Sequence, residues 1–234
     1  MMSEKIIKST KRVKENGEVF TPNRIVKLML DQPEIKSKIH DLFATFLEPA
    51  AGEGAFLVEL LKQKLEVALT KSNSASAYNR NCLIALASLY GIEYLEDNVE
   101  MLVMNMITAF NRAYIQGIKT FDKKPSYQVL DSAKVIIRTN MAQGDTLKYI
   151  NADGDPILFS EWKRVKGKPN WVQRTEYTFE SIINESGPTN LVAGETEELD
   201  LFADSDFFSE EPLKPKLHRY KPCKWIDIYK QEVE

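Results

Sequence analysis

Cysteine and histidine are scarce in this chain, and long apolar runs are missing from it. Two Cys and two His occur among 234 residues, which excludes a disulfide framework and argues against a zinc site. No apolar run approaches the ~18 residues of a transmembrane helix, and the Lys-rich start lacks the apolar core of a secretory signal. We therefore expect a soluble protein of the reducing cytoplasm, with one main domain and appendages.

Charge is spread unevenly along the sequence. The net charge is −3, yet residues 184–212 contain nine acidic residues and no Lys or Arg, which leaves 31 basic and 25 acidic residues elsewhere. That balance permits contact with a phosphate backbone. A basic cluster near the start is interpreted either as a DNA contact or as a solvated lead-in to the first helix; it comprises Lys5, Lys8, Lys11, Arg12 and Lys14.

The most informative segment covers residues 46–56, Phe-Leu-Glu-Pro-Ala-Ala-Gly-Glu-Gly-Ala-Phe. It has the pattern of a strand that ends in a carboxylate and a glycine turn that opens a helix. Gly52 and Gly54 would let the backbone turn tightly and approach a ligand, beside the unpaired N–H groups of the helix. Glu48 would lie at the carboxyl end of the strand, where it favours a cationic ligand. The alternative is a tight turn that binds nothing.

Three further segments accompany this loop in a set order. They are Gly-Glu-Val-Phe-Thr-Pro at 17–22, Tyr-Gly-Ile-Glu-Tyr-Leu at 90–95 and Gln-Gly-Asp-Thr-Leu at 143–147. Together the four segments resemble the S-adenosylmethionine site of adenine-N6 DNA methyltransferases. The resemblance implies a Rossmann-like fold, S-adenosylmethionine as cofactor and DNA as partner.

The resemblance also implies roles for individual residues. Thr21 would hold the methionine carboxylate, Glu93 the ribose hydroxyls and Asp145 the adenine amino group. Each has a structural alternative: Thr21, Glu93 and Asp145 could cap helices, and Phe20 and Tyr94 could be core aromatics. The complete expected cofactor site is Phe20, Thr21, Glu48, Pro49, Ala50, Gly52, Gly54, Glu93, Tyr94, Asp145 and Thr146.

The target-base motif of that family is not found. These enzymes carry Asp/Asn-Pro-Pro-Tyr/Phe to hold the flipped adenine, and this sequence contains no Pro-Pro pair. The nearest segments are Gly-Asp-Pro-Ile at 154–157 and Lys-Pro-Asn-Trp at 168–171. We therefore expect a subunit or divergent member of a restriction-modification system that needs a partner for methylation. The alternative is a non-catalytic accessory or regulatory protein that binds S-adenosylmethionine or DNA.

Hydrophobic periodicity up to residue 145 predicts alternating helices and strands, and hence a parallel sheet. Helices are predicted over 22–40, 55–69, 79–89, 97–114 and 126–136, and strands over 44–48, 90–94 and 138–143. Thr21 is the predicted cap of the first helix, and Asp97 or Asn98 that of the fourth. Forty-five positions separate Glu48 from Glu93, against about 20 in a dinucleotide fold, so an extra helix must intervene.

Beyond Asp145 the pattern favours a short antiparallel appendage. Segments 147–150 and 157–165 flank a turn signal at 151–155, and 171–179 alternates like another strand; a divergent fourth strand of the main sheet is the alternative. Residues 220–230 suit one strand or a short docking helix. The predicted divisions are a cofactor domain over 1–146, a β-rich appendage over 147–183, a flexible linker over 184–212 and a docking segment over 213–234.

Within the acidic segment, residues 198–202 read Glu-Leu-Asp-Leu-Phe. This resembles the Gln-Leu-Ser/Asp-Leu-Phe peptide that binds the bacterial sliding clamp, with Glu198 in place of Gln. Leu199, Leu201 and Phe202 would be its anchors. The alternative is that the segment folds back onto the chain's own domain.

Overall fold

A short parallel sheet organises the first part of the chain. In the computed structural model, which describes residues 10–16, 21–184 and 217–234, the strands β1 (Phe46–Glu48), β2 (Leu89–Glu93) and β3 (Met141–Gln143) pair in the order β1–β2–β3. Both pairings are parallel, so the three carboxyl ends meet at one edge. The mixed α/β architecture predicted from the sequence is confirmed.

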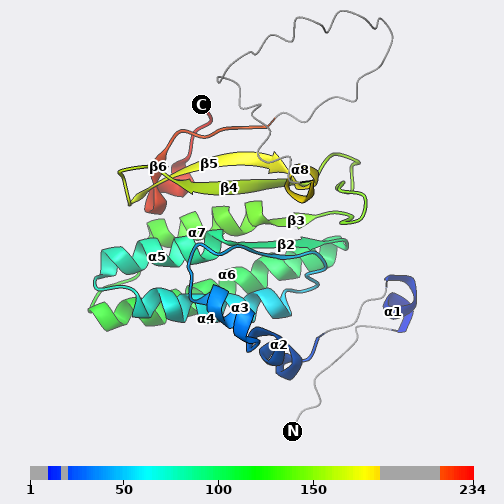
Figure 1. The fold of residues 1–234 in the computed structure, drawn as a ribbon, viewed down its shortest axis with the longest axis horizontal. Coiled ribbons are helices and arrows are strands. Elements are labelled where there is room, and N and C mark those ends of the chain that lie inside the picture. Colours follow the sequence, from blue (N-terminus) through cyan, green and yellow to red (C-terminus); the bar gives the residue numbers. More distant parts are fainter. Residues whose placement is uncertain (1–9, 17–20, 185–216) are drawn as a thin grey trace, which may run out of the picture.

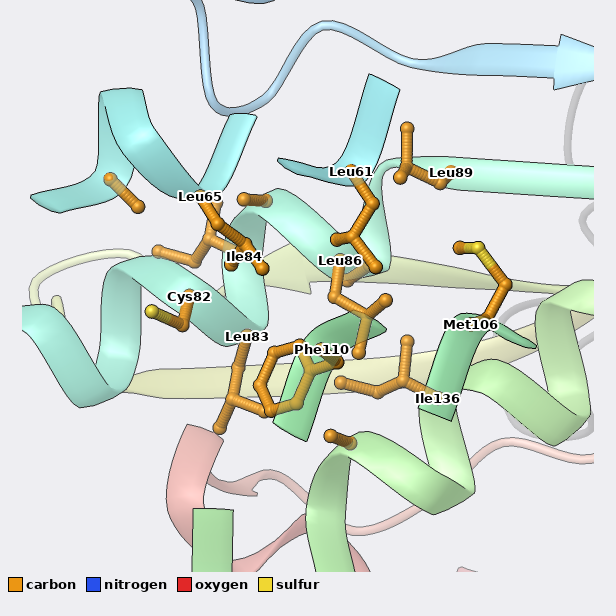
Figure 2. Close-up of a cluster of buried hydrophobic side chains, with 14 of the residues drawn as sticks. Leu61, Leu65, Cys82, Leu83, Ile84, Leu86, Leu89, Met106, Phe110 and Ile136 are labelled. Atoms are coloured by element: carbon orange, nitrogen blue, oxygen red, sulfur yellow. The ribbon is translucent and has the colours of Figure 1, made fainter. Parts of the chain in front are cut away.

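Four long helices form the core beside this sheet (Figure 1). α4 (Ala55–Thr70) and α5 (Ala75–Ala87) connect β1 to β2, whereas α6 (Glu96–Ile118), the 3₁₀ turn η1 (Lys119–Phe121) and α7 (Tyr127–Asn140) connect β2 to β3. The extra helix expected between Glu48 and Glu93 is therefore present. Figure 2 shows side chains from all four helices meeting in one buried cluster, among them Leu61, Leu65, Leu83, Leu86, Phe110 and Ile136.

The single helix predicted over residues 22–40 is wrong. The structure divides it into α2 (Asn23–Leu30) and α3 (Pro33–Ile39), preceded by α1 (Thr10–Asn16). Proline disfavours helical geometry in the residue before it, and Gln32 is accordingly extended, with ψ 133°. Pro22, not Thr21, is the N-cap of α2, so the predicted cap is also wrong.

Three other boundaries differ from the prediction. α5 begins earlier than expected because the Ser74 hydroxyl caps it, accepting the Ala77 N–H at 3.3 Å. α6 has Leu95 as its N-cap, so neither Asp97 nor Asn98 fills that role. α7 extends to Asn140, whose buried amide donates to the carbonyls of Ala87 and Leu89, and this leaves β3 shorter than the predicted strand.

A second, antiparallel sheet follows. It contains β4 (Leu158–Arg164), β5 (Trp171–Thr178) and β6 (Cys223–Lys224), flanked by α8 (Phe179–Ile183) and the 3₁₀ segment η2 (Trp225–Lys230). The β4–β5 hairpin closes at 165–170. The turn predicted at 151–155 also reverses the chain: Ile150 and Pro156 form an antiparallel bridge across it, and Asn151 Oδ1 accepts the N–H groups of Asp153 and Asp155. The predicted strand over 171–179 is confirmed as β5, and residues 220–230 form both a strand and a 3₁₀ segment.

The antiparallel sheet covers the face of the parallel sheet opposite the helices (Figure 1). The Tyr90 hydroxyl donates to the Ser160 carbonyl at 2.9 Å, and the Trp162 indole N–H donates to Asn140 Oδ1 at 3.1 Å. A separate buried cluster joins the two sheets and contains Ile92, Ile157, Phe159 and Phe179. The two layers are thus held by both apolar and polar contacts.

No helix in the described ranges is long and apolar enough to cross a bilayer. The acidic segment, with its proposed anchors Leu199, Leu201 and Phe202, lies outside the described residues, apart from Asn184. The domain divisions expected from the sequence remain predictions.

Candidate cofactor site

Hydrogen bonds join the loops at the carboxyl ends of the three parallel strands. The Ala51 N–H donates to the Ile92 carbonyl at 2.9 Å, and the Gly144 N–H donates to the Glu93 carbonyl at 3.0 Å. The Thr146 hydroxyl donates to the Pro49 carbonyl at 2.6 Å. The loops that follow β1, β2 and β3, predicted separately from sequence, therefore form one continuous surface.

The loop after β1 owes its path to two glycines with left-handed backbone geometry. Gly52 has φ +53° and Gly54, the N-cap of α4, has φ +87°. A Cβ on Gly54 would lie 2.4 Å from a methyl carbon of Leu102, whereas one on Gly52 would meet no atom within 4 Å. Gly54 thus allows α4 and α6 to pack closely, and Gly52 borders open space in which a ligand can approach the backbone.

The Glu93 side chain links the loop after β1 to the start of α6. Its buried carboxylate accepts the Gly52 N–H at 2.8 Å through Oε2. Its Oε1 accepts the Leu95 N–H at 3.0 Å and the Asn98 side-chain amide at 3.3 Å. An ionised carboxylate has about four acceptor positions, so one position on Oε2 remains for a ligand hydroxyl.

Glu48 lies at the end of β1 with an unusual electrostatic environment. Burial, followed by the charge of the Glu93 carboxylate, raises the pKa of Glu48 to about 8, although a hydrogen bond from the Leu57 backbone opposes the shift. Its Oε2 is buried and accepts no hydrogen bond from the described residues. A buried carboxylate oxygen without a donor is costly, and a cationic donor brought beside Oε2 would remove that cost.

Asp145 is engaged in its own turn. Its Oδ1 accepts the N–H groups of Leu147 and Lys148, at 2.9 and 3.2 Å, and its Oδ2 lies 3.2 Å from the Lys148 ammonium. Desolvation, the largest single contribution, acts to raise its pKa, but the hydrogen bonds from Lys148 and Leu147 together outweigh it and leave the pKa lowered. The carboxylate is therefore kept ionised, and a ligand amine would have to share it with these donors.

The remaining expected residues occupy different positions. Tyr94 follows β2 with its ring 62 % exposed, and Pro49, Ala50 and Thr21 are also exposed. Phe20 lies outside the described residues. The structure thus brings the loops of Glu48, Gly52, Glu93 and Thr146 together by hydrogen bonds, whereas the contribution of Thr21 and Tyr94 stays a prediction.

Several residues that support the site were not identified from sequence. Asn98 holds Glu93, and the Asn105 amide on α6 donates to the Glu53 carbonyl at 2.9 Å, which fixes the glycine loop from outside. Arg12 on α1 makes two hydrogen bonds to Asp97, at 2.8 and 3.0 Å, next to these residues. The sequence signal for Asn98 and Asn105 was their spacing of seven residues, about two helical turns, along α6.

The two segments nearest to a target-base motif lie at opposite ends of the antiparallel sheet. Pro156 forms a bridge with Ile150, which in turn pairs with Asp145, so this segment borders the candidate site. Asn170, by contrast, accepts a hydrogen bond from Arg80 on α5 at 3.0 Å, at the hairpin end of β5. Of the two, only the first is positioned to approach the candidate site.

A family model described as N-6 DNA Methylase matches residues 3–141, a range that includes β1, β2 and the start of β3. No curated protein and no solved structure shows a significant match.

Proposed function

The chain belongs to the N-6 DNA methylase family, and from this premise we propose that it binds S-adenosylmethionine at the carboxyl ends of β1, β2 and β3. The proposal extends to a role as a subunit or divergent member of a DNA modification system. Methylation of adenine by that system would require a partner.

The observation that carries the proposal is one carboxylate oxygen of Glu48. This oxygen, Oε2, is buried without a hydrogen-bond donor among the described residues, beside a glycine loop whose backbone borders open space. The ammonium group of the methionine moiety would supply the missing donor and positive charge. When bound, S-adenosylmethionine would present an electrophilic methyl group on its sulfonium.

The other residues suit the remaining parts of the cofactor. The free acceptor position of Glu93 suits a ribose hydroxyl, because Oε2 accepts only the Gly52 N–H among the described groups. The exposed ring of Tyr94 can stack on adenine, and Asp145 can accept its amino group in competition with Lys148. Thr21 and Phe20 are proposed on the resemblance alone.

The chain by itself is proposed to lack methyl transfer to DNA. It contains no Pro-Pro pair, and the segment nearest the site, Asp155-Pro156, has neither the second proline nor the aromatic residue. Transfer requires the adenine amine to be held in line with the methyl group. A non-catalytic accessory protein would bind the same cofactor, and would differ in that no partner restores methylation.

Calorimetry with S-adenosylmethionine and with its demethylated product tests the proposal. Both should bind, and at ~100 Kd either should stabilise the fold by ~2.7 kcal/mol. Glu48→Ala should weaken binding by about tenfold or more, because a charge-assisted hydrogen bond is lost. Glu66→Ala, an exposed position on α4, is the control. Absence of heat and of a thermal shift at millimolar ligand would refute cofactor binding.

A further inference from the structure

β1 forms an open edge of the parallel sheet. Within the described ranges it pairs with β2 and with no strand on its other side. The Phe46 N–H donates to the Ser88 carbonyl, at the start of β2. Because successive residues of a strand direct their backbone groups to opposite sides, those of Leu47 point to the open edge. Such an edge presents donors and acceptors that another strand can join.

The open edge borders a groove of about 430 Å³ between the two sheets. β1 contributes one wall and β2 contributes Tyr90, whereas β4, with Glu161, and β5 and α8 contribute the other walls. The lining is largely apolar and aromatic; its main members are Leu47, Tyr90, Phe159, Tyr177 and Ile182. A groove of this composition beside unpaired backbone suits an extended peptide rather than a small polar ligand.

Large apolar side chains are exposed around this edge. Leu47 is 38 % exposed and Phe43, just before β1, is 41 % exposed. Ile182 and Ile183 on α8 are each 47 % exposed. Soluble proteins usually protect edge strands with charged residues, proline or a covering element. An apolar edge that the described residues leave without that protection indicates an interface.

The topology indicates what kind of partner fits. Open doubly wound sheets continue on both sides of their first strand, and their ligands bind where the strand order reverses. Among the described residues the sheet ends at β1. Glu48, at the carboxyl end of β1, therefore lies at the position of a strand-order reversal but has a neighbouring strand on one side only. A strand added parallel to β1 would complete the other side.

Charge defines the direction of the partner strand. Just before the amino end of β1, the guanidinium of the exposed Arg164 lies over the Phe43 ring, 4.1 Å from its centroid. At the carboxyl end lies Glu48. A parallel strand with an acidic amino-terminal flank is complementary to this arrangement.

We propose that the open edge of β1 and the adjoining groove bind an extended, apolar strand of a partner polypeptide, in parallel with β1. The loop that follows the added strand then lies beside Glu48. The next step rests on the proposed function: this loop supplies the contact to the target adenine that the chain itself lacks. A second copy fits less well, because two-fold pairing would align the three-residue β1 strands antiparallel and leave the carboxyl end of β1 unextended.

A displayed library of random ten-residue peptides tests the proposal on the full chain. Selected peptides should contain a Val-, Ile- or Leu-rich run after acidic residues, since a strand buried in a parallel sheet is apolar on both faces. Leu47→Lys and Ile182→Lys should weaken their binding by about tenfold or more, because each places a charge in the groove. Ile183→Lys is the matched control: the exposure is equal, but the residue does not line the groove.

N-methylation of the selected peptide separates strand addition from simple filling of the groove. Two peptides are compared, each methylated on every second amide. Methylation of the amides that point toward β1 should abolish binding, whereas methylation of the amides that point away should not. Thermal melts of the three Lys variants exclude misfolding. Calorimetry with S-adenosylmethionine should be unchanged in Ile182→Lys, so loss of peptide binding and loss of cofactor binding are independent results.

Three results would overturn the proposal. The first is no enrichment of peptides, or enriched peptides that bind Leu47→Lys and Ile182→Lys as well as the original chain. The second is a concentration-dependent dimer that Leu47→Lys dissociates, which would assign the edge to a second copy. The third is peptide binding that appears only after residues 185–216 are deleted, which would assign the groove to that segment.

Discussion

The carboxylate of Glu93 accepts the backbone N–H of Gly52 at 2.8 Å. This contact joins the end of β2 to the glycine loop after β1, 41 positions earlier in the chain. Because Glu93 also accepts the Leu95 N–H and the Asn98 amide, one buried side chain sets the positions of the loop and of the start of α6. Glu93 is therefore the side chain that ties the glycine loop to the start of α6.

Replacing that carboxylate should destabilise the protein. Glu93→Gln substitutes one oxygen with an NH₂ group, which then faces a donor, and a buried donor left unsatisfied costs about 1–3 kcal/mol. Chemical denaturation should show this loss, and calorimetry should show weaker cofactor binding. Glu100→Gln, exposed on α6, should change neither. Equal stability of the two variants would mean that Glu93 does not organise the loop.

Glu48→Gln should change how stability depends on pH. The folded pKa of Glu48 is raised from 4.5 to about 8, so the folded state binds the proton more tightly than the unfolded state. The contribution of this proton to the free energy of unfolding is fully present below pH ~4.5 and is lost as the pH rises through ~8. A pKa difference of one between the two states corresponds to about 1.4 kcal/mol, so Glu48→Gln should be more stable than the original chain by up to a few kcal/mol at high pH.

Urea denaturation across pH 4.5–8 measures this difference. The free energies of unfolding of the two proteins should diverge steadily over the window, with the variant above the original chain. Curves that stay parallel would show that Glu48 titrates at its ordinary pKa, and that its carboxylate is better solvated than the structure indicates.

Binding of a cationic cofactor should release a proton from Glu48. Near pH 7 the side chain is largely protonated, because its pKa is about 8, and pairing with an ammonium group favours the ionised form. Calorimetry in two buffers of different ionisation enthalpy should give release of roughly one proton. Glu48→Gln should release none, and release that persists in this variant would assign the proton to another group.

Gly54→Ala should cost more stability than Gly154→Ala. The two glycines have nearly equal φ angles, +87° and +86°, but a Cβ would overlap Leu102 only at Gly54. Backbone strain of about 1–3 kcal/mol applies to both, and the overlap adds to it at Gly54 alone. Thermal or chemical denaturation of the pair measures the difference. Equal losses would show that Leu102 moves aside without cost.

The sequence was informative where local chemistry decides the structure. Gly52 and Gly54 adopt the left-handed turn that their lack of a Cβ suggested, and Glu48 and Glu93 end adjacent parallel strands as expected. The break at Gln32 was also readable, since Pro33 follows it, but the apolar periodicity of residues 22–40 obscured it.

Other features depended on contacts between distant residues. The hydrogen bond between Glu93 and Gly52 requires the register of two strands, and the raised pKa of Glu48 requires its burial. The extension of α7 depends on Asn140 reaching Ala87 and Leu89 in another connection. No local pattern encodes these relationships, so sequence alone predicted the strand ends but not how they are joined.

η2 packs over α7 but follows it in the sequence, so α7 is synthesised before the residues that cover it. The Ser132 hydroxyl donates to the Ile226 carbonyl and accepts the Tyr229 N–H, while Trp225 and Ile228 are buried. A ribosome that adds about 5–20 residues per second makes the covering residues on the order of ten seconds after α7. During that interval the nascent chain exposes an apolar helix surface, so a chaperone that binds apolar segments would act on it then.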